Sequence, residues 1–138
     1  MSEHEEQTVV MDWAFYNSRR WPALKWLFAI PNGAKLPYKK TRGGRYSREA
    51  LWLKAEGLKA GVSDLMLPHA SCSYHGLFIE MKHGKNKPTS NQKEFIYDMI
   101  KQGYAAMCCW EADGAIEVLE HYLEGDASWI ANKIAEPY

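Results

Sequence analysis

The sequence predicts an α/β fold in which a small mixed sheet is flanked by helices, in the order α-β-α-β-β-α-β-α. Short apolar segments typical of strands alternate with longer segments in which apolar residues recur every three or four positions. With 138 residues, 46% of them hydrophobic and 25% charged, the chain has the size and composition of one domain. We expect a single domain over residues 1–138, with a core at about 3–123 and a helical tail at about 126–138.

The first third of the chain predicts a helix, a strand and a loop. Residues 3–20 begin with acidic side chains and continue with apolar ones on one helical face. Residues 26–30 are apolar and stop at Pro31, so we expect a short buried strand. Residues 33–48 are rich in Gly, Lys and Arg and have few apolar side chains, which predicts a mobile basic loop.

The middle of the chain predicts a helix and a β-hairpin. Ser47 is a good N-terminal cap for a helix that ends near Gly57. Residues 62–67 and 76–82 are short apolar segments on either side of a turn-like segment at 68–73, as expected of two antiparallel strands.

The last third begins with a helix from Thr89 to about Gln102. Thr89 and Gln92 have the spacing of a capping box, in which each side chain satisfies the other's backbone amide. Beyond this helix we expect a strand at 104–110, a helix at about 111–123, and a final helix at 126–135 anchored by Trp129 and Ile130.

Charge and cysteine content exclude several classes of protein. Seventeen Lys and Arg balance seventeen Asp and Glu, so only local patches can argue for a nucleic-acid partner. Three cysteines, two of them adjacent, do not resemble a disulfide framework, and we expect the adjacent Cys108 and Cys109 in the core. We also expect no signal peptide, no membrane span and no zinc site, and a cytoplasmic location.

Two acids and a lysine in the predicted hairpin indicate a catalytic site. Strand alternation puts Glu80 and Lys82 on the same face, and burying such charges is costly unless they are paired or bind a metal. If the hairpin turns about Cys72, facing residues have numbers that sum to 144, so Asp64 lies opposite Glu80. Facing carboxylates can hold one Mg²⁺, and the lysine can orient or deprotonate water that attacks a phosphodiester. The alternative is that Asp64 caps a turn and the other two form a solvated pair on an edge strand.

Four segments carry a family resemblance, at residues 30–33, 53–65, 79–82 and 89–92. Their order and spacing resemble VRR-NUC domain proteins of the standalone, phage-borne kind, within the PD-(D/E)XK nuclease superfamily. The resemblance covers roughly residues 3–123. It implies a restriction-endonuclease-like core and an endonuclease that depends on Mg²⁺ or Mn²⁺.

The resemblance also implies roles for individual residues. Asp64 and Glu80 would bind the metal together with the backbone carbonyl of Ile79, and Lys82 would position the attacking water. Gln92 is implied as an active-site residue, although the capping box alone would also explain its presence.

At two points the sequence departs from the family pattern or leaves a choice of residue open. Ser63 stands where many relatives have Pro before the acid, a tolerable change. The family also places a glutamate of the first helix near the metal. Glu3, Glu5 and Glu6 compete for that role, and we favour Glu6 because Gln7 follows it as in similar sequences.

Local basic patches predict contact with DNA. Residues 35–59 hold eight Lys and Arg against Glu49 and Glu56, and more lysines follow the catalytic strand. A solvated loop without a partner is the alternative. The predicted DNA-binding residues are Lys35, Lys39, Lys40, Arg42, Arg45, Arg48, Lys54, Lys85 and Lys87.

Standalone members of the family resemble Holliday junction resolvases. This implies branched DNA as the substrate and a homodimer with two sites, in the host cytoplasm if the protein is phage-borne. A flap nuclease acting as a monomer is one alternative, and a catalytically silent nucleic-acid-binding module is another.

Overall fold

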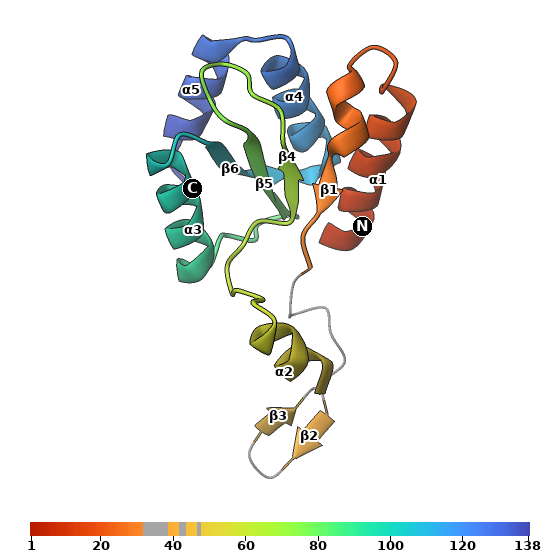
Figure 1. The fold of residues 1–138 in the computed structure, drawn as a ribbon, viewed down its shortest axis with the longest axis vertical. Coiled ribbons are helices and arrows are strands. Elements are labelled where there is room, and N and C mark those ends of the chain that lie inside the picture. Colours follow the sequence, from red (N-terminus) through yellow and green to blue (C-terminus); the bar gives the residue numbers. More distant parts are fainter. Residues whose placement is uncertain (32–38, 42–43, 47) are drawn as a thin grey trace.

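The computed structural model describes residues 1–31, 39–41, 44–46 and 48–138. Its centre is a four-stranded mixed sheet in the order β1-β4-β5-β6 (Figure 1). The first three strands pair antiparallel, and the last two pair parallel. The predicted α/β architecture with a small mixed sheet is therefore confirmed. The strands are β1 (Phe28–Ala29), β4 (Leu65–Leu67), β5 (Leu77–Lys82) and β6 (Ala105–Trp110).

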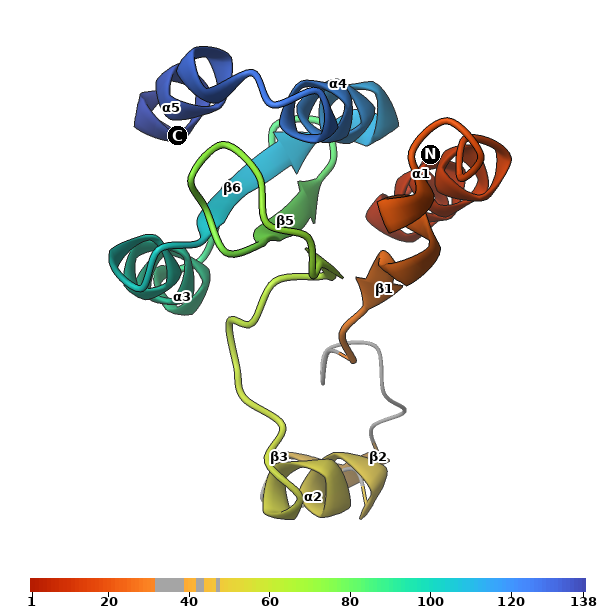
Figure 2. The same ribbon diagram turned by 45° about the horizontal axis from the view of Figure 1, so that its top comes forward.

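Helices cover both faces of this sheet, as Figure 2 shows from a second direction. α1 (Glu3–Tyr16), α4 (Glu111–Leu123) and α5 (Ala127–Ala135) pack on one face, and α3 (Ser90–Lys101) packs on the other against β6. Among the described residues, no helix has the length and apolar character needed to cross a bilayer.

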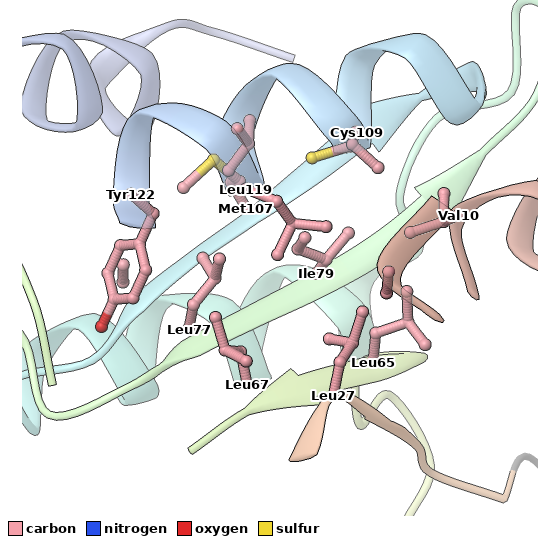
Figure 3. Close-up of a cluster of buried hydrophobic side chains, with 14 of the residues drawn as sticks. Val10, Leu27, Leu65, Leu67, Leu77, Ile79, Met107, Cys109, Leu119 and Tyr122 are labelled. Atoms are coloured by element: carbon pink, nitrogen blue, oxygen red, sulfur yellow. The ribbon is translucent and has the colours of Figure 1, made fainter. Parts of the chain in front are cut away.

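The core lies between the sheet and the first set of helices (Figure 3). Strand alternation places Leu77, Ile79 and Met81 in this core, where Val10 of α1 and Leu119 of α4 meet them. Phe78 lies on the opposite face and packs against the α3 side. The face that carries Phe78 also carries Glu80 and Lys82.

The hairpin register confirms the predicted pairing. Leu65 pairs with Ile79, Met66 with Phe78 and Leu67 with Leu77, and each pair of numbers sums to 144. The turn lies where the register requires it, since Cys72 and Ser73 both have positive φ, at 54° and 68°. The register therefore carries Asp64 to the position opposite Glu80.

Two expectations for the first third were wrong in extent. The first helix ends at Tyr16, with Asn17 as its cap, rather than at residue 20. The predicted strand at 26–30 is reduced to β1, because Pro22 begins a 3₁₀ helix that runs to Trp26.

The prediction of a basic loop at residues 33–48 is also wrong in part. β2 (Lys39–Thr41) and β3 (Gly44–Tyr46) pair antiparallel as a small hairpin, because main-chain pairing needs no apolar side chains. α2 (Arg48–Ala55) follows, and this segment lies apart from the four-stranded sheet (Figure 1). Ser47, the predicted cap, lies outside the described residues.

The later elements agree closely with the sequence. Thr89 and Gln92 form the predicted capping box at the start of α3, and α4 spans the predicted residues. Asp126 caps α5, Ile130 is fully buried in the core, and Trp129 packs beside it. Capping depends on residues three apart in sequence, which is why it could be read locally.

Candidate active site

Asp64, Glu80 and Lys82 meet beyond the last pair of the β4–β5 ladder. Their exposed fractions are 6%, 2% and 6%, so all three charged side chains are buried. Asp64 Oδ2 accepts the N–H of Met81 at 2.8 Å, which ties the carboxylate to the neighbouring strand. β5 is an interior strand of the sheet, so the alternative of a solvated pair on an edge strand is wrong.

Burial and a neighbouring acid raise the pKa of Glu80. Desolvation by burial is the largest cause. The hydrogen bond to Asp64 and the negative charge of Asp64 raise the pKa of Glu80 further, to about 9. Lys82 acts in the opposite direction but is outweighed. Two acids held this close cannot both ionise cheaply without a positive charge between them.

One oxygen of this pair is unsatisfied. Glu80 Oε1 is buried and has no hydrogen-bond partner among the described residues. A buried oxygen without a partner is costly, and a hard divalent cation is a natural partner for it. The residues present therefore fit a divalent metal held by Asp64 and Glu80.

The structure brings Glu3, rather than Glu6, to Lys82. Glu3 Oε1 lies 3.9 Å from Lys82 Nζ, and the Glu3 charge also contributes to the raised pKa of Glu80. Glu6 is buried and its Oε2 accepts the N–H of Ala112 at 2.6 Å, at the start of α4. The active-site role predicted for Glu6 remains a prediction. Glu3 is the acid of the first helix that contacts Lys82.

Gln92 fulfils the capping role. Its Oε1 accepts the N–H of Thr89 at 2.9 Å. The start of α3 also lies against the segment that leads into Asp64, because a Cβ on Gly61 would come within 2.4 Å of the Asn91 carbonyl oxygen. The predicted active-site role of Gln92 stays a prediction.

Cys108 lies next to the acidic pair. The parallel ladder pairs it with Glu80, and its side chain packs on the α3 side of the sheet. Burial, followed by the Glu80 charge, raises the pKa of the thiol to about 12, so Cys108 is a neutral neighbour. Cys108 and Cys109 are both buried, as predicted for core cysteines.

The sequence is similar to a known family over most of its length. The family model of the VRR-NUC domain matches residues 1–111, which include all of the acids and the lysine described above. The chain belongs to the VRR-NUC domain family. This is a nuclease family, and the mixed sheet flanked by helices is its restriction-endonuclease-like fold.

A solved structure supports the assignment to the VRR-NUC family. This chain is similar to a structure described as "VRR_NUC domain protein", with a TM-score of 0.71 and 32% sequence identity. The similarity covers 91% of this chain and 90% of the other. None of the curated proteins matches it.

The predicted DNA-binding residues of this VRR-NUC domain fall in different places. Arg48 and Lys54 are exposed on α2, and Lys85 and Lys87 are exposed in the segment that follows β5. Lys35 and Arg42 lie outside the described residues. Lys39, Lys40 and Arg45 belong to the β2–β3 hairpin.

Sequence reasoning missed a second cluster of titratable side chains in this domain. His83 Nδ1 lies 2.7 Å from Glu111 Oε2, and Gly84 donates its N–H to Glu111 Oε1 at 2.8 Å. Glu6 completes the cluster, since one ligand atom from each of Glu6, His83 and Glu111 lies within 4.8 Å of the others. The signal was that His83 and Glu111 each follow a strand directly, but only parallel pairing of those strands brings them together.

Proposed function

We propose that this VRR-NUC protein is a divalent-metal-dependent DNA endonuclease that hydrolyses phosphodiester bonds in branched DNA. The observation that carries the proposal is the buried Glu80 oxygen beside Asp64 and Lys82, which has no hydrogen-bond partner in the part of the chain that the structure describes. A protein that only bound DNA would gain nothing from two buried acids, which repel phosphate. A single domain would contain the whole site.

Asp64 and Glu80 would hold Mg²⁺ or Mn²⁺ through their carboxylates. When bound, the metal supplies a Lewis acid that withdraws charge from the scissile phosphate. The backbone carbonyl of Ile79 is our proposed further ligand. Met81 is the alternative source of a carbonyl, because its N–H already points toward Asp64 and both groups of a strand residue point to the same side.

Lys82 would act on the water and on the phosphate. Its ammonium group, buried beside the acids, can hold the attacking water and stabilise the charge that develops on the phosphate oxygens. Glu3 would keep the Lys82 ammonium oriented through the 3.9 Å charge contact. Gln92 would present its amide from the first turn of α3.

A four-way junction is the substrate that we favour. Cutting two strands symmetrically needs two sites, so we propose a homodimer. Trp26 and Trp52 are 63% and 67% exposed and offer apolar surface for such an interface. The host cytoplasm is the compartment that we propose if the protein is phage-borne. A flap nuclease acting as a monomer keeps the same chemistry with a different substrate.

The test incubates purified protein with labelled four-way junction, flap and plain duplex DNA in Mg²⁺, Mn²⁺ or EDTA. Glu80→Gln and Lys82→Ala are expected to abolish cleavage, whereas Glu94→Gln, an exposed glutamate on α3, should cut normally. Symmetric cuts in the junction would support a resolvase. Cuts in the flap DNA alone would make the protein a flap nuclease with the same chemistry. Binding without cleavage in any metal would leave the binding module as the function.

A further inference from the structure

The ends of β5 and β6 are joined by a carboxylate. The parallel ladder ends where Lys82 pairs with Trp110, and the residues that directly follow the two strands are His83 and Glu111. Glu111 uses both oxygens, since Oε2 contacts His83 Nδ1 and Oε1 accepts the N–H of Gly84. The turn that follows Lys82 is therefore clamped to the first residue of α4.

The first helix is docked to the same place through Glu6. The Glu6 carboxylate, 6% exposed, accepts the N–H of Ala112 in the first turn of α4. A negative charge at a helix N-terminus is favourable, because the first amides of a helix have no partners within it. Glu3 lies three residues before Glu6 on α1 and so projects from the same face of that helix.

We infer that Glu6 and Glu111 are positioning residues that hold Glu3 and Lys82 together across the active site. This inference rests on the proposed nuclease function, since it assigns how that site is kept in place. Glu6 acts by docking α1 on the start of α4, and Glu111 acts by fixing the turn after Lys82. The contact of 3.9 Å between Glu3 and Lys82 then follows from these two anchors.

The cluster of Glu6, His83 and Glu111 has the spacing of a cation site, so that role must be weighed. Glu6 and Glu111 each already accept a hydrogen bond from a backbone N–H. His83 already contacts the Glu111 carboxylate. A cation would have to compete with these hydrogen bonds for the same atoms. A positioning role requires no change in any of the hydrogen bonds that the structure shows.

The test compares Glu6→Gln, which keeps an oxygen for the Ala112 N–H, with Glu6→Ala, which does not. At a temperature where all variants are folded, Glu6→Gln should keep kcat within about threefold, and Glu6→Ala should lose about tenfold or more, because small displacements of reacting groups are costly. Glu111→Ala should lose a similar factor. Asp12→Asn, on the exposed face of α1, is the matched control and should cut normally.

A double-variant cycle separates positioning from a merely structural role. If Glu6 acts through Glu3, Glu6→Ala should lower kcat by less than about twofold in a Glu3→Gln background. An equal loss in Glu6→Gln and Glu6→Ala would mean that the Glu6 charge itself works in the site and would overturn the inference. Unchanged kcat in Glu6→Ala would overturn it too.

Two measurements need no cleavage. Hydrogen exchange followed by NMR should find the Ala112 amide protected in Glu6→Gln and unprotected in Glu6→Ala. If the natural protein fails to cut any DNA, the proposed function falls, and this exchange result still decides the anchor. Calorimetric titration of Mn²⁺ into the Asp64→Ala/Glu80→Ala double variant should show no binding. If this double variant does bind Mn²⁺, and adding His83→Ala abolishes the binding, then the cluster is a cation site and the inference is overturned.

Discussion

Asp64 and Met81 are joined by a hydrogen bond of 2.8 Å between the carboxylate and the backbone N–H. The bond crosses from the residue before β4 to the residue that follows Glu80, and so it holds the two acids at facing positions. Glu80, by contrast, has one buried oxygen, Oε1, without a hydrogen-bond partner among the described residues. The pairing of a fixed acid with an unsatisfied one determines the electrostatics of the site.

Stability without metal should fall as the pH rises. Burial and Asp64 raise the pKa of Glu80 to about 9, so between its ordinary value and about 9 the folded protein holds a proton that the unfolded chain has lost. The folded state binds more protons in this window, and the free energy of unfolding therefore decreases with pH. In EDTA we expect it to be about 1 to 3 kcal/mol lower near pH 8 than near pH 6. Urea titrations at the two pH values measure this, and Glu80→Gln should flatten the dependence.

Divalent metal should stabilise the protein through the two acids. A ligand that binds only the folded state raises its stability, by about 2.7 kcal/mol at 100 times the dissociation constant. Mg²⁺ and Mn²⁺ should therefore raise the melting temperature relative to EDTA, and Asp64→Ala and Glu80→Ala should remove the shift. Differential scanning fluorimetry reads this directly. A shift of equal size in both variants would place the bound metal elsewhere.

Gly61→Ala should destabilise the protein much more than Gly57→Ala. Both glycines have positive φ, 87° and 113°, so both alanines carry a similar conformational cost of about 1 to 2 kcal/mol. Only at Gly61 would the new Cβ also meet backbone, 2.4 Å from the Asn91 carbonyl oxygen. We expect an added loss of about 1 to 3 kcal/mol for Gly61→Ala in chemical denaturation. Equal losses in the two variants would show that the contact with α3 relaxes without cost.

Lys85 and Lys87 should contribute to DNA affinity through phosphate contacts. Each contact with duplex DNA changes the slope of log affinity against log salt by about 0.9, so the double alanine variant should lower the slope by about 2. Its affinity should fall to a similar degree on all DNA sequences, since these contacts read no bases. Lys101→Ala is the control, because Lys101 is at the opposite end of α3 from Asn91 and pairs with Asp98. Fluorescence anisotropy across a salt series gives both slopes.

Several features of the fold could be read from the sequence because their causes are local. The capping box of Thr89 and Gln92 joins residues three apart, and the alternation in β5 depends only on the two-residue period of a strand. The hairpin register follows from its turn, so the facing positions of Asp64 and Glu80 were available as soon as the turn was placed at Cys72. The short β1 was overestimated because apolar content alone does not distinguish a strand from a 3₁₀ turn begun by Pro22.

The order of the main elements, the hairpin register and the facing positions of the two acids could be predicted in advance, since each depends on neighbours along the chain. The rest of the site depends on how distant elements pack. Parallel pairing of β6 with β5 brought Cys108 beside Glu80 and joined Glu111 to His83. Docking of α1 on the start of α4 selected Glu3 as the acid near Lys82. Residues that are distant in sequence meet only through the packing of whole elements. The spacing of side chains along the chain does not predict that packing.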